Sequence, residues 1–321
     1  MLIAALGLAP AVLAQQTIEV QLAFSPGGRD AYLYVGEEKG YFAAEGLKVN
    51  ITAGNGGVNM ARNVDQRQFF IGNGADLSAL LPLRAAGSDL VGVMVLNAQS
   101  PYGFQSFASK GITTPKAMEG FTIGIEPGSM GERILIMLMG INGADYSKIN
   151  VIPMDGSQYV GALLSGQIDI ISGFADSLYG VVKVRAAQRG ETLNAIWAGD
   201  WGLDTYGTFV VVKEETLRNE PELVEAFLRA AKRAVDDVKA NPAEAAKIMA
   251  GQLVGAGEQV VLAQGEEGLA GAFDETSAAL GFGCANMDKM QRSVDVFAEA
   301  LELDSVAAST LFTNDYMAWC R

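Results

Sequence analysis

Carboxylate, amide, hydroxyl and aromatic side chains stand at the ends of several short apolar runs of this 321-residue chain. Carboxylates accept hydrogen bonds and aromatic rings stack, so such a set suits a flat heterocycle that carries N–H donors. We predict that the following residues bind a ligand: Phe24, Ser25, Asp30, Tyr32, Asn55, Asn73, Asp76, Tyr102, Ser129, Asp155, Phe174, Asp176, Trp201 and Tyr206.

Most of these residues also have a simpler structural interpretation. Aspartates in such loops most often cap helices. This role fits the four aspartates of the set, Asp30, Asp76, Asp155 and Asp176. Tyr32 could equally be an ordinary core residue. Trp201 lies in a loop without a strand or helix pattern, so its ring is harder to explain as core.

The chain contains no histidine. This excludes histidine acid–base catalysis, Ser-His and Cys-His nucleophiles, and most zinc sites. The two cysteines, Cys284 and Cys320, both lie late in the chain and away from the nominated loops. We therefore predict no catalytic residue, no metal site and no cofactor.

The charge balance argues against two classes of partner. The chain has 23 basic and 37 acidic residues, a formal net charge of −14. Nucleic acids and anionic membrane surfaces both attract basic patches. We expect no nucleic-acid partner, whereas a small ligand depends only on the charges beside it.

The elements that must position these side chains alternate between strand and helix patterns. Apolar residues alternate in residues 18–23 and 47–52, and the helix-compatible residues 31–39 lie between them. The same order recurs up to residue 96 and again in residues 121–176. This predicts the α/β class, in which ligands bind outside the carboxyl ends of parallel strands.

The length of the chain predicts two lobes, because one small core rarely holds so many residues. We expect lobe 1 to comprise residues 15–103 plus 210–321, and lobe 2 to comprise residues 104–209. Extended crossovers are expected near 102–109 and 208–212. A cleft between two such lobes closes on its ligand by hinge motion, and we expect the protein to be a monomer.

Residues 1–14 are apolar, end in small residues and precede two glutamines, as in a signal peptide cleaved near Ala14. We therefore expect export to the periplasm. In an exported protein an even cysteine count favours a disulfide, here between Cys284 and Cys320. Two free buried thiols are the alternative.

Four short segments carry a family resemblance. Residues 34–42 read YVGEEKGYF, residues 45–49 read EGLKV, residues 166–169 read GQID and residues 218–221 read RNEP. In this order they resemble solute-binding proteins of ABC importers that serve nitrate, sulfonates such as taurine, and thiamine pyrimidine precursors. The resemblance implies a two-lobed, type II-like periplasmic binding protein fold and delivery of a small molecule to a membrane permease.

The resemblance leaves the ligand open. An aromatic or heterocyclic compound, such as a pyrimidine-like vitamin precursor, is the first expectation. The pyrimidine-binding branch of the family has an Asn-His pair where this chain has Arg29 and Asp30, which is a departure from that branch. A sulfonate, taurine or nitrate is the alternative, held at the helix N-terminus that begins at Ser129. An enzyme on the same scaffold, similar to a pyrimidine synthase, is the alternative class.

Overall fold

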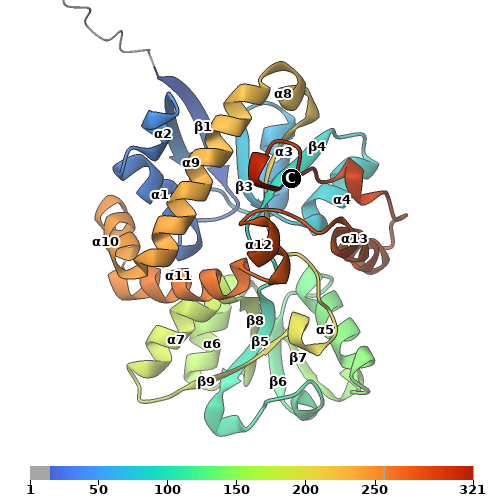
Figure 1. Ribbon diagram of the computed structural model, residues 1–321. Helices are drawn as coiled ribbons and strands as arrows, with labels where there is room; N and C mark the ends of the chain where they lie inside the picture. Colours follow the sequence, from blue (N-terminus) through green and yellow to red (C-terminus); the bar gives the residue numbers. More distant parts are fainter. Residues whose placement is uncertain (1–14, 256, 321) are drawn as a thin grey trace, which may run out of the picture.

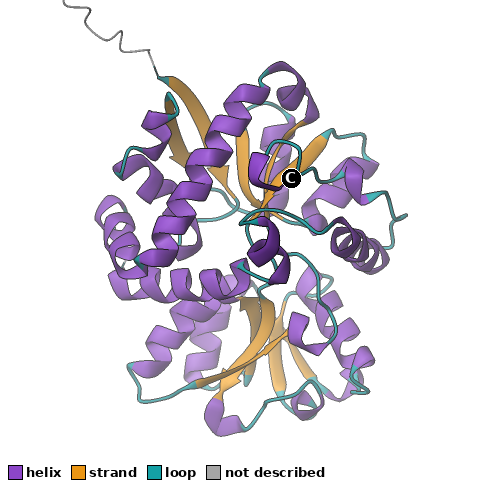
Figure 2. Cartoon of the chain, in the orientation of Figure 1, coloured by secondary structure: helices purple, strands orange, loops and turns teal. Residues whose placement is uncertain are grey.

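The computed structural model describes residues 15–255 and 257–320. The chain forms two mixed sheets, each covered by helices, so the α/β two-lobed prediction is confirmed (Figures 1 and 2). The expected signal peptide, residues 1–14, lies outside the described residues. Within the part of the chain that is described, no helix is both long enough and apolar enough to cross a membrane.

The first sheet has five strands in the order β2-β1-β3-β10-β4. Its strands are β1 (Gln16–Leu22), β2 (Leu47–Thr52), β3 (Ile71–Ala75), β4 (Leu90–Val95) and β10 (Phe209–Lys213). β1 runs parallel to β2 and β3, as the βαβ pattern predicts, whereas β10 is antiparallel to both of its neighbours. Every residue of β4 is buried, which suits its unbroken apolar sequence.

The second sheet also has five strands, in the order β7-β6-β8-β5-β9. Its strands are β5 (Tyr102–Phe107), β6 (Thr122–Ile125), β7 (Asn150–Pro153), β8 (Ile170–Phe174) and β9 (Leu193–Trp197). β6 is parallel to β7 and β8, and β5 is antiparallel to β8 and β9. Each lobe thus places an antiparallel strand among strands joined by helical connections.

Helices connect these strands and continue after the last one. Those that precede β5 or follow β10 in the chain are α1 (Ala31–Glu38), α2 (Tyr41–Ala44), α3 (Gly57–Asp65), α4 (Leu77–Ala85), α8 (Glu214–Asn219), α9 (Pro221–Ala240), α10 (Pro242–Gln252), α11 (Glu258–Ala272), α12 (Glu275–Leu280) and α13 (Met287–Leu301). Those within the second set are α5 (Met130–Ile141), α6 (Tyr159–Ser165) and α7 (Gly180–Ala187). The short turns η1 (Gly28–Asp30), η6 (Ala175–Tyr179) and η7 (Ala198–Trp201) lie near the junction.

The two connections between the sheets differ from the sequence-based expectation. The extended segments expected to be crossovers, near 102–109 and 208–212, are mainly strands β5 and β10 of the two sheets. The chain passes between the sheets at 96–101 and 198–208 instead. β10 contributes a fully buried run of valines, and burying such a run stabilises a central strand far more than an exposed linker. We propose that the lobe boundaries fall in these two connections.

The predicted disulfide between Cys284 and Cys320 is confirmed, with their Cα atoms 5.6 Å apart. The neighbouring Trp319 donates its indole N–H to the carbonyl of Phe282 at 2.8 Å. Together these contacts hold the end of the chain against the segment that precedes α13.

We expect thiol titration of the denatured, unreduced protein to find no free thiol. Reduction should lower the free energy of unfolding by about 3–4 kcal/mol, because the bridge restricts the unfolded chain. Chemical denaturation with and without reductant measures this effect, with the Cys284→Ala, Cys320→Ala double variant as a reductant-insensitive control. Two titratable thiols in the denatured, unreduced protein would contradict the bridge.

Candidate functional site

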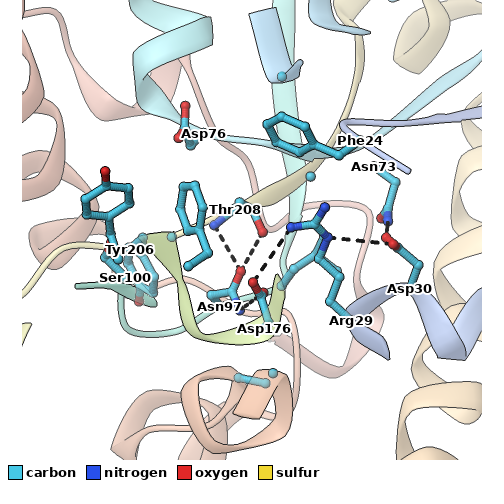
Figure 3. Close-up of a pocket in the computed structure, with 18 of the residues that line it drawn as sticks. Phe24, Arg29, Asp30, Asn73, Asp76, Asn97, Ser100, Asp176, Tyr206 and Thr208 are labelled. Carbon is cyan, nitrogen blue, oxygen red and sulfur yellow. Dashed lines mark hydrogen bonds and ion pairs between the residues drawn. The ribbon is translucent and has the colours of Figure 1, made fainter. Parts of the chain in front are cut away.

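A cavity of about 220 Å³ lies between the two lobes (Figure 3). The loops that follow β1, β3 and β4 line it from the first sheet, and the turn after β8 lines it from the second. The nominated residues that line it are Phe24, Asp30, Tyr32, Asn73, Asp76, Tyr102, Phe174, Asp176 and Tyr206. The structure therefore gathers residues that follow parallel strands together with Tyr102 and Tyr206, which lie at or before the start of the antiparallel strands β5 and β10.

The other nominated residues do not line this cavity. Ser25 and Asn55 lie in exposed loops of the first lobe. Asp155 is exposed and caps η5 (Gly156–Gln158), where its carboxylate accepts the N–H of Ser157 at 2.8 Å. The Ser157 hydroxyl, together with this backbone bond, holds the pKa of Asp155 below its usual value. The simpler capping role accounts for this aspartate.

Ser129 also acts as a helix cap. Its hydroxyl accepts the N–H of Glu132 at 3.3 Å at the start of α5. The Glu132 carboxylate in turn accepts the N–H of Gly128 at 2.6 Å. The Ser129 hydroxyl thus takes one first-turn N–H of α5, and Glu132 places a negative charge at the helix end that was expected to hold an anion.

Trp201 belongs to the core of the second lobe rather than to the cavity. Its ring packs against the hydrophobic cluster around Ile123 and Leu135. Its carbonyl accepts the side-chain N–H of Asn142 at 2.9 Å. The turn η7 places the ring against this cluster. The glycine and aspartates that flank Trp201 in the sequence did not predict this position.

Several cavity residues were not nominated from the sequence. They include Arg29, Asn97, Ser100, Met130, Ile134, Thr208 and Phe297. Asn97 and Ser100 follow the end of β4, so the rule that selected the other loops could also have selected them. Phe297 comes from α13, and no pattern in the sequence connects that helix with the distant loops.

The guanidinium of Arg29 lies between two of the cavity carboxylates. Its Nε lies 3.6 Å from Oδ2 of Asp30, and its Nη1 lies 3.7 Å from Oδ1 of Asp176. Asp30 belongs to the first lobe and Asp176 to the second, so one guanidinium faces a carboxylate from each (Figure 3). The ring of Phe24 lies over the guanidinium, with 5.4 Å between its centroid and Cζ.

A network of first-lobe side chains holds the Asp30 carboxylate. It accepts the amide N–H of Asn73 at 2.9 Å and the backbone N–H of Gly27 at 3.1 Å. Tyr32 donates its hydroxyl to the amide oxygen of the same asparagine. Tyr32 is therefore both a core residue and a support for the site, which unites its two interpretations.

The carboxylate of Asp176 accepts fewer hydrogen bonds than that of Asp30. Its Oδ2 accepts the amide N–H of Asn97 at 3.3 Å, and the Asn97 oxygen accepts the hydroxyl of Thr208. Among the described residues, none donates a hydrogen bond to Oδ1 of Asp176, although the residue is only 2% exposed. This buried acceptor lines the cavity and is available to a donor on a ligand.

Burial controls the protonation of the cavity carboxylates. It raises the pKa of Asp30 from 3.8 to about 6, against the opposing effects of Arg29 and of the Gly27 N–H. Burial likewise raises the pKa of Asp176, which Arg29 and Asn97 oppose. For Asp76, burial raises the pKa against the hydrogen bond from Ser78. The cavity thus concentrates acceptors in a desolvated place, where an unpaired acceptor is costly.

The described residues do not include three histidine, cysteine, aspartate or glutamate side chains grouped to hold a metal ion. Both cysteines are engaged in the disulfide. The geometry is that of a binding cavity with aromatic walls, several acceptors and one guanidinium.

Comparisons with known proteins find relatives in sequence and in fold. A family model described as NMT1/THI5 like matches residues 30–245. A riboflavin-binding protein, RibY, of Chloroflexus aurantiacus is 30% identical over 251 residues, 74% of this chain and 67% of that protein. A formylaminopyrimidine-binding protein of Halalkalibacterium halodurans is 26% identical over 249 residues, 74% of this chain and 70% of the relative.

Solved structures share the fold at lower sequence identity. The periplasmic aliphatic sulphonate binding protein SsuA of Escherichia coli superposes with a TM-score of 0.67 at 14% identity, over 92% of this chain and 91% of its own. The desulfurization enzyme DszB does so with a TM-score of 0.58 at 15% identity, over 94% and 97%. The fold therefore occurs in binding proteins and in an enzyme, whereas the two sequence relatives above are both binding proteins. From the family match, which covers more than half of its length, the chain belongs to the NMT1/THI5-like family.

Proposed function

We propose that this chain is the periplasmic solute-binding protein of an ABC importer. It captures a small aromatic or heterocyclic compound between its lobes and delivers it to the membrane permease. The observation that carries the proposal is the composition of the cavity wall, in which three aspartates and several aromatic rings surround a single basic residue, Arg29. The names of the two sequence relatives, which bind riboflavin and formylaminopyrimidine, support a heterocyclic ligand.

The charges of the cavity do not favour a small anion. Both sides of the Arg29 guanidinium already face carboxylates, and an added anion would lie close to these negative charges. The N-terminus of α5, the other expected anion site, has the carboxylate of Glu132 beside it, and that negative charge disfavours an added anion. A sulfonate or nitrate would therefore find no uncompensated positive charge in the cavity wall.

The same groups suit a flat ring with N–H donors. Oδ1 of Asp176 offers a buried acceptor. The guanidinium of Arg29 next to it offers N–H donors, because it lies 3.6 Å and 3.7 Å from the two carboxylates, beyond the usual distance of a hydrogen bond. Tyr102 and Phe174 meet edge to face with centroids 5.0 Å apart and form an aromatic wall. The volume of about 220 Å³ is smaller than that of pockets for drug-sized ligands, about 300–1,000 Å³, and favours a compound of one or two rings.

The raised pKa of Asp30 makes the stability of the folded protein depend on pH. Its folded pKa of about 6 lies above its usual value of 3.8, so between these values the folded protein holds a proton that the unfolded chain has lost. The contribution of Asp30 to stability is therefore greatest at low pH and decreases as the pH rises through this window. This sign is opposite to that of an ordinary salt-bridged aspartate.

We expect calorimetry against pyrimidines, purines, flavins, sulfonates and nitrate to detect binding of a heterocycle that carries N–H donors. Phe24→Ala should weaken that binding by about twofold to tenfold, because the exposed ring flanks the cavity. Ile136→Ala, an exposed apolar position outside the cavity lining, is the matched control. Tight binding of nitrate or taurine that does not respond to Phe24→Ala would contradict the ligand class.

Asp176→Asn should weaken binding of the same compound by about tenfold to a hundredfold, because a charged acceptor is lost from a buried place. Asp155→Asn, which changes an exposed cap outside the cavity, should leave the dissociation constant unchanged. Titration calorimetry of the three proteins measures the difference. Equal affinities for all three would show that Asp176 makes no contact with the ligand.

Asp30→Asn should remove a pH-dependent part of the stability. Between about pH 3 and pH 7 the free energy of unfolding of the native protein should fall, relative to that of the variant, by about 3 kcal/mol. Urea denaturation of both proteins across this range tests the expectation, with Asp155→Asn as control. A difference between native protein and variant that does not change with pH would show that Asp30 is not protonated at unusually high pH.

A further inference from the structure

Helix α11 lies along one side of the junction between the lobes, although it follows the last strand of the first sheet by many residues (Figure 1). It contacts η1 of the first lobe and both η6 and α7 of the second. These two turns carry the charged groups of the cavity, Arg29 and Asp30 on η1 and Asp176 on η6. One helix therefore packs against both halves of the charged cluster.

A single side chain of α11 hydrogen-bonds to both turns. Oε1 of Gln264 accepts the backbone N–H of Gly28 at 3.0 Å. Its Nε2 donates to the carbonyl of Ser177 at 3.1 Å. Gly28 precedes Arg29 and Ser177 follows Asp176, so the amide joins the residues next to the three charged groups.

The packing around this amide leaves no room for adjustment. A Cβ atom on Gly28 would lie 2.1 Å from the carbonyl oxygen of Val261 on α11. A Cβ atom on Gly180 of α7 would lie 2.9 Å from the backbone nitrogen of Gln264. α11 thus touches backbone of both lobes directly, and substitutions there would push the lobes apart.

A second contact ties α11 to the second lobe. Lys183 of α7 forms an ion pair with Glu267 of α11 at 2.7 Å. Because the lysine is about half exposed, this pair contributes less than the partly buried amide bonds. The Gln264 bonds are therefore the main polar contacts of α11 with the cavity turns.

We propose that Gln264 is a positioning residue of the binding site. It sets the separation of the turn that carries Arg29 and Asp30 from the turn that carries Asp176, and it holds the two lobes together on this side of the cleft whether or not a ligand is bound. That Gln264 positions a binding site rests on the proposed binding function. That Gln264 holds the two lobes together does not rest on it. Ligand entry then requires these two hydrogen bonds to open.

Two substitutions of Gln264 test the two ends of the bridge. Gln264→Leu keeps most of the volume and removes both bonds, which leaves the Gly28 N–H and the Ser177 carbonyl unpaired. Gln264→Glu keeps the acceptor for Gly28 and replaces the donor to Ser177 with a charged oxygen that repels the Ser177 carbonyl, so it breaks the lobe 2 contact alone. Gln252→Leu is the matched control, because Gln252 lies exposed on α10 and bonds Glu38 within the first lobe.

The measurement is the distance between the lobes in ligand-free protein. Spin labels at Lys48→Cys on β2 and at Lys116→Cys in the second lobe are both at exposed positions. Pulsed dipolar spectroscopy should give one short, narrow distance for the labelled parent and for the Gln252→Leu control. Both Gln264 variants should raise the ratio of open to closed molecules by about tenfold.

Two outcomes would overturn the proposal. The first is a broad or long distance distribution in the labelled parent, and the second is a distribution for both Gln264 variants that superimposes on it. Circular dichroism verifies that each variant is folded. Lys183→Ser, which removes the exposed ion pair with Glu267, is a second and milder perturbation and should also raise the ratio of open to closed molecules. Because no ligand is used, either failure leaves the binding function untouched. Failure of the calorimetric panel would remove the role in a binding site and would leave the closure by Gln264 standing.

Discussion

The site depends on one guanidinium placed between two buried carboxylates. Asp30 and Asp176 are each 2% exposed, and isolated buried charges are costly unless they are paired. Arg29 faces one carboxylate from each lobe, at 3.6 Å and 3.7 Å, and so compensates charges that belong to different sheets. The pairing of Arg29 with Asp176 is available only when the lobes are together, whereas Asp30 lies on the same turn as Arg29. The electrostatics of the cavity are therefore coupled to its closure through Asp176.

The rest of the fold can be understood as support for this cluster. Strand β3 supplies Asn73, and the loop after β4 supplies Asn97, as hydrogen-bond donors to the two carboxylates. α11 packs across the turns that carry the charges, with Gln264 bonded to both. The long ion-pair distances leave donor capacity on Arg29 and an acceptor on Asp176, so the support is firm while the polar atoms stay available.

Local patterns in the sequence predicted much of this arrangement. The alternation in residues 18–23 and 47–52, with a helix between, became β1, α1 and the parallel neighbour β2, because side-chain period and turn residues act over a few positions. The rule that ligands bind at strand ends then selected most of the nominated cavity residues. It failed for Ser129 and Asp155, which cap helices outside the cavity, since a cap and a ligand contact use the same residue types.

The sequence by itself determined the α/β class, the family and the disulfide partners, because these depend on local periodicity, short segments and a choice of only two cysteines. Tertiary structure alone decided that Trp201 packs into the second core and that β5 and β10 are strands rather than linkers. It also decided that Gln264 bonds residues 236 and 87 positions away. Such contacts follow from how the lobes and α11 pack, and no short-range pattern in the chain encodes that packing.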